Sequence, residues 1–345
     1  MKNDEARLDI FFRPSVLLSI LTFLFLLASS HSISLISLSF VVLCLLMFFV
    51  GELLGIRSFK QKVVKKSLPQ ALKIAYWMYA VSIVSLHLNF YASGGIPLLQ
   101  PAIRQFMNPL LTTLSFLIVP AALLLMVGYS EHRKSKIRML AIFAVTLFLI
   151  SLTGFRTEVM VFLFSTLLVL RYTGIVSTKQ VMQLGILAVL FFFALTLLRT
   201  GSFDSNRISS TVSAYDFVVS QSDLTGYTKG FVQFADFIDI FSSFPIYGGR
   251  TLISSLIGVR SGVSTTSMLY GPPYADFGFV GSLIFLFFGW VLGFGYKAAS
   301  KGSGYAILHS LVLVFLLIGI ETGIVDLIVW LYFIAAFSYY KYNES

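Results

Sequence analysis

The sequence predicts an all-α polytopic membrane protein: one helical bundle over residues 1–345 with about ten transmembrane helices and a long structured outer loop. Composition is the first reason, because mean hydropathy is +0.88, 57% of residues are hydrophobic and only 12% are charged. No compact soluble core could hide that much apolar surface from water. The second reason is that apolar runs of about twenty residues, the length that crosses a bilayer as a helix, recur along the whole chain.

The predicted spans follow one another closely in most of the chain, and hydropathy locates their starts to within several residues. In the eighth span, Gly289 and Gly293 form a small-xxx-small pair, which we assign to close helix packing. The starts lie near Arg13, Ile33, Gln70, Met107, Ile137, Thr157, Val181, Tyr274, Gly304 and Gly323.

Lysine and arginine assign a side of the membrane to each connection, because they favour the cytoplasmic side. Every second connection is basic, so these connections and both termini are expected to be cytoplasmic. The basic segments contain Arg57, Lys60, Lys62, Lys65 and Lys66; Arg133, Lys134, Lys136 and Arg138; Arg171 and Lys179; Lys297 and Lys301; and Lys341. The outward connections are then the turn around His31, residues 92–106, the turn 154–156, residues 199–270 and the turn at Glu321.

The first apolar run, residues 16–28, is expected to remain as a span, although a cleaved signal sequence is the alternative. Asp4, Glu5 and Asp9 make a poor positively charged leader, and residues 28–30 make a weak cleavage site. Removal of this run would leave every later connection on the same side of the membrane. The charge pattern therefore does not distinguish a retained span from a cleaved signal sequence.

The outer connection 199–270 is too long and too aromatic to be a simple linker, so we expect it to be structured. Its phenylalanines recur at helical spacing, which predicts an amphipathic helix in the membrane interface whose aromatics either face lipid or line a groove for lipid or sugar. A further apolar run, residues 252–259, is too short to span and is expected to be interfacial or re-entrant. The phenylalanines are Phe231, Phe234, Phe237 and Phe241.

Seven cations are predicted on the outer side, and six of them are arginines. Cations in short outer segments run against the usual bias, so a partner should compensate for them. Guanidinium groups pair bidentately with phosphate-like oxyanions, which predicts a site for a phosphorylated substrate. Nucleic acid is not indicated, because no basic domain stands apart from the apolar runs. The seven are Arg104, Arg156, Arg199, Arg207, Lys229, Arg250 and Arg260.

Three of these arginines are predicted to bind the phosphate directly. Arg156 opens the sixth span, where a cation costs about half a kcal/mol unless an anion joins it, either Glu158 or a bound phosphate. Arg250 follows two glycines and precedes a short helical run, so backbone NH groups and a guanidinium could form an oxyanion cradle. Arg199 ends the seventh span. The remaining three, each of which also fits a solvated loop residue, are expected to help hold phosphate or sugar: Arg104, Arg207 and Arg260.

Asp276 is the predicted general base, at the outer start of the eighth span. A carboxylate there can cap the helix. Beside arginines and an acceptor hydroxyl it could instead take a proton, a contribution of about 10² to 10⁴. Tyr270 and Tyr274 of the same stretch are expected to contact the substrate. The alternatives for the base are Glu158, Glu321 and His87.

Several other classes of site find no support in the sequence. Cys44 is the single cysteine, and the four histidines fall in different segments without metal-ligand spacing, so neither a metal nor a disulfide is predicted. No phosphate-binding loop, dinucleotide fingerprint, nucleophile elbow or zinc-protease signature occurs, so no cofactor is expected.

Three short motifs carry a family resemblance: Gly94-Gly95-Ile96-Pro97-Leu98-Leu99, Gly154-Phe155-Arg156 and the stretch 274–281, Tyr-Ala-Asp-Phe-Gly-Phe-Val-Gly. With the span count and the long outer loop, they resemble the Wzy-type O-antigen and oligosaccharide repeat-unit polymerases over most of the chain. The resemblance implies a GT-C-like integral-membrane glycosyltransferase, related in fold to O-antigen ligases and to the peptidoglycan polymerases of the shape and division family. A histidine expected in the outer loop of the ligases is absent from residues 199–270, which favours a polymerase.

The implied reaction joins undecaprenyl-pyrophosphate-linked oligosaccharides outside the cytoplasmic membrane. A hydroxyl of one unit attacks the anomeric carbon of the growing chain, and arginines that neutralise the departing pyrophosphate could supply most of the catalysis without a metal. A flippase and a chain-length-regulating co-polymerase are implied partners. The rival functions are a transporter of the same lipid-linked sugars, a ligase-like transferase and a non-enzymatic scaffold. A transporter should show internal repeats, and we find none in the sequence.

Overall fold

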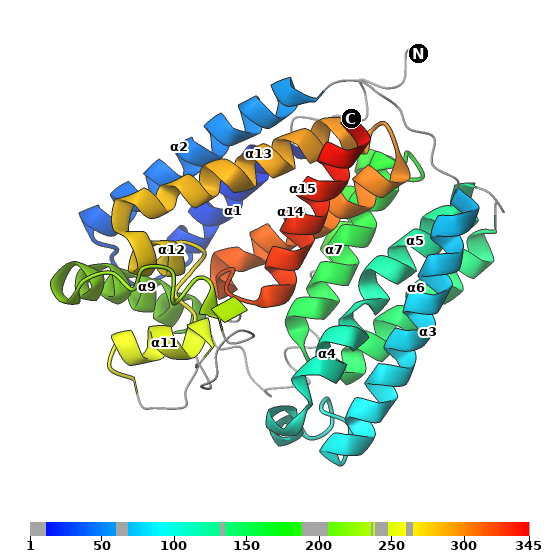
Figure 1. Cartoon of the computed structure of the whole chain (residues 1–345), viewed down its shortest axis with the longest axis horizontal. Helices are drawn as coiled ribbons and strands as arrows, with labels where there is room; N and C mark the ends of the chain where they lie inside the picture. Colours follow the sequence, from blue (N-terminus) through cyan, green and yellow to red (C-terminus); the bar gives the residue numbers. More distant parts are fainter. Residues whose placement is uncertain are drawn as a thin grey trace. The chain divides into compact units, whose positions relative to one another are not determined.

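The structure, a computed structural model, describes residues 12–59, 68–131, 135–187, 206–235, 237–238, 248–259 and 265–344. These residues form helices, turns and connections and contain no strand. They divide into two compact units (Figure 1). Of the described residues, the first unit holds 68–131, 135–187 and 299–311, and the second holds 12–59, 206–235, 237–238, 248–259, 265–298 and 312–344.

The first unit is a bundle in which α3 packs against α4 and α5, and α5 packs in turn against α6 and α7. One apolar run forms both α4 and α5, which are interrupted at Leu117. Pro120 explains the interruption, because a proline ring clashes with the carbonyl four residues earlier and is tolerated only in the first turn of a helix. The helices are α3 (Leu68–Ser93), η3 (Pro101–Phe106), α4 (Pro109–Phe116), α5 (Ile118–Glu131), α6 (Lys136–Leu152), α7 (Arg156–Tyr172) and the segment 178–187.

The second unit combines long apolar helices with shorter helices from the outer connection. Helix α14 (Ser303–Thr322) begins in the first unit and ends in the second. The other helices are α1 (Pro14–Leu27), α2 (Leu35–Ser58), α9 (Asn206–Thr225), α11 (Gly249–Leu256), α12 (Gly271–Phe277), η4 (Gly278–Gly281), α13 (Ser282–Ala299) and α15 (Leu327–Glu344).

Helices α2 and α13 are in direct backbone contact through glycines. A Cβ added to Gly289 would lie 2.1 Å from the Phe48 carbonyl oxygen, and one added to Gly293 would lie 2.1 Å from that of Glu52. Gly51 and Gly55 on α2 approach α13 equally closely. The predicted packing role of Gly289 and Gly293 is confirmed, and the structure adds the two glycines that face them.

Five helical stretches in the described part of the chain are long and apolar enough to cross a membrane, and two of them contain a break. Pro14–Leu27 and Leu327–Lys341 are shorter apolar helices. A helix occurs at every predicted span start, while the number that cross the bilayer stays a prediction. The five are Leu35–Ser58, Ala71–Ser93, Leu110–Ser130, Gly271–Ala299 and Ser303–Thr322.

The eighth predicted span is not a continuous helix. It starts as α12, passes through the 3-10 turn η4 and continues as α13. At the junction Gly278 adopts φ 57° and ψ −140°, a conformation that side-chain-bearing residues rarely tolerate. The sequence expectation of a single helix from near Tyr274 missed this break.

The outer connection is structured where it is described, with a different layout from the one expected. Residues 229–234 form turns, because Lys229 and Gly230 have φ values of 54° and 99° that cannot continue a helix. The predicted helix through Phe231 and Phe234 is therefore wrong in its first part, and Phe241 lies outside the described residues. Phe234 packs on Trp330, with ring centroids 5.0 Å apart.

The main element of the outer connection is instead α9, which the hydropathy pattern did not single out. Its buried residues recur at helical spacing and form one face. This face includes Val212, Tyr215, Val218, Val219 and Ser222.

Candidate functional site

Segments predicted to be outward lie together at one end of the second unit. Ser30, in the turn between α1 and α2, bonds to Ser209 on α9 at 2.9 Å, and the Tyr215 hydroxyl on α9 donates to the Ser37 carbonyl at 2.8 Å. Figure 1 shows α9, α11 and α12 near the same end of α2 and α13. Two of the five connections predicted to be outward are therefore neighbours in space, while the side of the membrane that they face stays a prediction.

Asp216 on α9 joins that helix to the start of α2. It accepts hydrogen bonds from the Ser37 hydroxyl at 2.6 Å and the Ser34 backbone NH at 3.0 Å, and it lies 3.3 Å from His31 Nε2. Burial by itself would raise the pKa of Asp216, but hydrogen bonds from Ser34, Ser37 and His31 outweigh it and hold the pKa below its ordinary value. Asp216 is therefore an ionised anchor for the outer connection.

Two of the predicted arginines pair with carboxylates near the junction of α14 and α15, one in the last turn of α14 and one in the connection that follows it. Arg207 on α9 lies 2.5 Å from Glu321, and Arg250 on α11 pairs with Asp326. Arg250 Nε also donates to the Thr322 carbonyl at 3.4 Å. All four side chains of the two pairs are between 32% and 46% exposed, so both pairs are open to solvent. The positive charges of these two arginines are therefore compensated by carboxylates of the protein itself.

Gly249 allows Arg250 to reach this position. A Cβ at Gly249 would lie 2.4 Å from the Val232 carbonyl oxygen and 3.0 Å from Val325 Cβ. Only glycine lets the first turn of α11 lie against both segments. The second glycine of the Gly-Gly-Arg stretch is therefore needed because the backbone of α11 lies against Val232 and Val325.

Asp276, the predicted base, is 1% exposed and fully engaged. Its carboxylate accepts the Val232 NH at 3.0 Å, the Gln233 NH at 2.6 Å and the Thr228 hydroxyl. Backbone bonds from residues 228 and 229 to the carbonyls of residues 275 and 276 reinforce the junction. Asp276 thus caps the segment 228–233 instead of its own helix, which corrects the expected cap, and it keeps these residues in their turn conformation.

The two predicted tyrosines have separate surroundings. Tyr270 is buried, stacks on Phe285 at 5.3 Å and shares a 2.7 Å hydrogen bond with Thr22. It is therefore part of the core of the second unit. The hydroxyl of Tyr274, also buried, donates to Asp223 at 2.9 Å.

The remaining predicted residues are either in the first unit or outside the described part. Arg156 and Glu158 lie in the first turn of α7, and the tight turn before it, with Gly154 at φ 65°, is confirmed. Arg104 lies in η3, and His87 Nδ1 donates to the Ile83 carbonyl of its own helix at 2.8 Å. The convergence of all six arginines stays a prediction. Arg199 and Arg260 lie outside the described residues.

Sequence reasoning missed Asp216, Asp223 and Tyr227. A signal for them existed, because α9 carries a helical stripe of apolar residues and places Asp216 and Asp223 two turns apart. Tyr227 follows Asp223 by four residues and donates to it at 3.0 Å.

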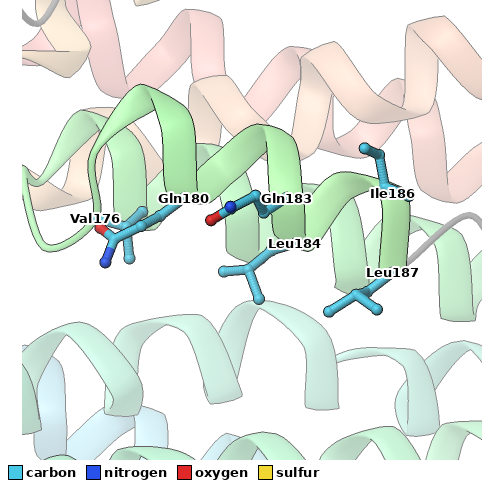
Figure 2. A pocket seen from close by; sticks show the side chains of 6 residues that line it. All are labelled: Val176, Gln180, Gln183, Leu184, Ile186 and Leu187. Atoms are coloured by element: carbon cyan, nitrogen blue, oxygen red, sulfur yellow. The ribbon is translucent and has the colours of Figure 1, made fainter.

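A groove of about 570 Å³ lies in the first unit beside the segment 178–187. Figure 2 shows Leu184 and Leu187 pointing to one side of this helix. None of the residues that line it is charged, so nothing in it favours a phosphate. They are Val176, Gln180, Gln183, Leu184, Ile186 and Leu187. Among the described residues of both units, no three His, Cys, Asp or Glu side chains are grouped so that they could hold a metal ion.

Comparisons with known proteins assign the chain to a family. A family model described as "Putative O-antigen polymerase" matches residues 9–333. An uncharacterized protein of Methanocaldococcus jannaschii is 29% identical over 278 residues, which cover 78% of this chain and 76% of that protein. No solved structure matches the chain. Because the family model spans nearly the whole sequence, the chain belongs to the O-antigen polymerase family.

Proposed function

We propose that this protein polymerises oligosaccharide repeat units carried on a lipid diphosphate, by glycosyl transfer at the outer face of the cytoplasmic membrane. Membership of the family supports a glycosyltransferase-like activity. The observation that supports the site is the pair of solvent-open arginine–carboxylate contacts, Arg207 with Glu321 and Arg250 with Asp326, at the end of the second unit where segments predicted to be outward gather.

The reaction needs little besides positioning and charge neutralisation. A hydroxyl oxygen of the incoming unit bonds to the anomeric carbon of the growing chain, and the bond from that carbon to the carrier diphosphate breaks. The diphosphate leaves with the electron pair, and the hydroxyl proton passes to a base or to water. Guanidinium groups stabilise the charge that develops on the departing oxygen, a term that is commonly the largest in such catalysis.

The internal ion pairs do not prevent arginine from taking this role. Exposed pairs are typically worth about 0–1 kcal/mol, so a ligand that offers more charge and bidentate acceptors can replace the carboxylate. We propose that the diphosphate displaces Asp326 from Arg250 and Glu321 from Arg207. Arg156, Arg199, Arg104 and Arg260 are proposed to complete the charge neutralisation, without a metal ion.

The roles of the acidic residues follow from their contacts. Asp276 is proposed as a positioning residue, because its carboxylate is occupied by the turn at residues 228–233. Glu158 is proposed to orient Arg156, since both lie in the first turn of α7.

The direct test is polymerisation by the purified full-length protein in proteoliposomes. The substrate is lipid-linked repeat unit extracted from the producing cells, with products resolved on gels in the presence of EDTA. We expect a ladder of glycans from the wild type. Arg156→Ala, Arg199→Ala and Arg250→Ala should lower turnover at least about 100-fold, with only partial rescue by lysine because a bidentate contact is lost.

Arg138→Ala is the matched control, since Arg138 lies near the start of α6, beside an inward connection, and its guanidinium sits over the Tyr129 ring. It should leave turnover unchanged. A wild type that makes no ladder in this assay overturns the proposal, and movement of unextended substrate across the liposome membrane would support the transporter instead. Full activity in all three alanine variants would leave the family assignment intact and remove the arginine site.

A further inference from the structure

An exposed carboxylate on α9 sits among aromatic side chains and is not used by the proposed chemistry. Asp223 accepts hydrogen bonds from the Tyr274 hydroxyl at 2.9 Å and from the Tyr227 hydroxyl at 3.0 Å. The two tyrosine rings meet edge to face at 6.2 Å. Two separate segments of the second unit therefore converge on one carboxylate.

The cluster is held in place from below. Tyr274 is buried and packs edge to face against Phe40 at 4.8 Å and Phe279 at 5.6 Å. Tyr227 lies across the backbone of Gly278, where an added Cβ would be 2.6 Å from the ring and 2.7 Å from the hydroxyl. A side chain at position 278 would displace Tyr227, so this glycine makes room for the ring as well as breaking the helix.

The upper side of the cluster is open. Asp223 is exposed, Tyr227 is 42% exposed, and Phe279 beside them is 45% exposed. An ionised carboxylate has about four acceptor positions. Both tyrosine bonds fall mainly on Oδ1, with only a longer 3.1 Å contact from Tyr274 to Oδ2. Asp223 can therefore accept further hydrogen bonds from a bound molecule.

The chemistry of this surface matches a sugar and excludes a phosphate. Neighbouring hydroxyls of a pyranose can donate to one carboxylate, and the negative face of an aromatic ring attracts the ring C–H groups. A diphosphate would be repelled by Asp223, because none of the ion pairs among the described residues involves this carboxylate. Burial and the neighbouring Asp223 raise the pKa of Tyr227, so its hydroxyl remains a donor at physiological pH.

We propose that Asp223, Tyr227 and Tyr274 form a subsite for a neutral pyranose of the acceptor unit. The proposal rests on the proposed polymerase function and adds the substrate group that this surface binds. Asp223 accepts hydrogen bonds from the sugar hydroxyls, Tyr227 provides the stacking face, and Tyr274 positions the carboxylate. The motif at residues 274–281 then has two roles. Asp276 holds the segment 228–233 in its turn conformation, and Tyr274 and Gly278 position Asp223 and Tyr227 of the proposed sugar subsite.

The test uses sugar binding and turnover as separate readouts. The probe is the repeat-unit oligosaccharide released from its lipid by mild acid, observed by saturation-transfer NMR on the full-length protein in nanodiscs. Asp223→Asn keeps the shape and both tyrosine bonds but removes the charge. It should weaken binding about tenfold or more and raise the KM for the acceptor with little change in thermal stability. Tyr227→Ala should do the same, and Tyr227→Phe should retain most of the stacking.

Two controls separate this subsite from the rest of the protein. Phe231→Ala removes an exposed aromatic residue of the same segment and should leave binding unchanged. Arg250→Ala should abolish turnover yet retain oligosaccharide binding. Equal binding and KM in wild type and Asp223→Asn would overturn the subsite while leaving the polymerase proposal intact. If the wild type bound the oligosaccharide through Asp223 but made no polymer, the polymerase proposal would be overturned and the sugar subsite would stand.

Discussion

Gly293 on α13 faces Glu52 on α2 so closely that a Cβ added to the glycine would lie 2.1 Å from the glutamate carbonyl oxygen. The carboxylate of the same Glu52, which is fully buried, lies 3.1 Å from Arg13 at the start of α1. The backbone contact between Gly293 and Glu52 thus fixes the distance between α2 and α13. The Arg13 guanidinium compensates the Glu52 carboxylate, which would be costly to bury without a partner.

Replacement of Gly293 by leucine should therefore destabilise the second unit strongly. The helices must separate to admit the side chain, which typically costs 1–3 kcal/mol or more and also disturbs the neighbouring ion pair. The melting temperature of the detergent-solubilised protein measures this. Gly185→Ala is the control, because nothing lies within 4 Å of an added Cβ there. Equal melting temperatures for Gly293→Leu and wild type would contradict the packing.

The ion pair of Arg250 with Asp326 has two interpretations, and they predict different effects of replacing each residue. If Arg250 binds the diphosphate, Arg250→Ala loses activity, whereas Asp326→Asn frees the guanidinium and keeps or lowers the KM for lipid-linked substrate. If the pair only holds α11 against the α14–α15 connection, both variants lose stability and activity together. Steady-state kinetics and melting temperatures of the two single variants and the double variant distinguish these outcomes. We expect the first.

Asp276→Asn should loosen the turn at residues 228–233. The amide offers one acceptor oxygen where the carboxylate offers two, so a buried NH of Val232 or Gln233 faces an NH₂ group, at a cost of about 2–3 kcal/mol. Limited proteolysis should then cleave within residues 226–235 faster than in the wild type. Asp223→Asn, at an exposed carboxylate of the same region, is the control and should not accelerate cleavage. Unchanged cleavage in Asp276→Asn would argue against a positioning role.

Acid should weaken the anchor that Asp216 provides. Its pKa is lowered in the folded protein, so the stabilisation is fully present above the unfolded value of about 4 and is lost as pH falls through the lower folded value. Asp216→Asn should be less stable by about 1 kcal/mol at pH 6, and the difference should shrink below about pH 4. Melting temperatures across this range provide the measurement. A difference that grows on acidification would contradict the assignment.

The membrane orientation can be tested by labelling single cysteines that are introduced on either side of the membrane. Cys44 is the single cysteine and is buried, so it should give little background labelling. Leu224→Cys, at a residue 79% exposed on α9, should react with a membrane-impermeant maleimide on intact spheroplasts. Lys179→Cys should react only after permeabilisation. The opposite labelling pattern would invert the topology and move the proposed site to the cytoplasm.

The sequence by itself determined the helical class and the starting points of the apolar helices, and it predicts which connections share a side of the membrane. These properties follow from local composition, because bilayer thickness sets run length and the membrane sorts positive charge. It also identified Gly289, Gly293 and the stretch 274–281 as special, since glycine and proline constrain the backbone wherever they occur.

Only the tertiary structure decided which chemical groups meet. The carboxylate of Asp276 accepts from backbone NH groups more than forty positions earlier in the chain, and Arg250 pairs with Asp326, which lies 76 positions later. Asp223 gains its proposed role because α12 brings Tyr274 to it. Hydrogen bonds and ion pairs act over a few ångströms, so long-range partners depend on how the helices pack, which no periodicity along the chain records.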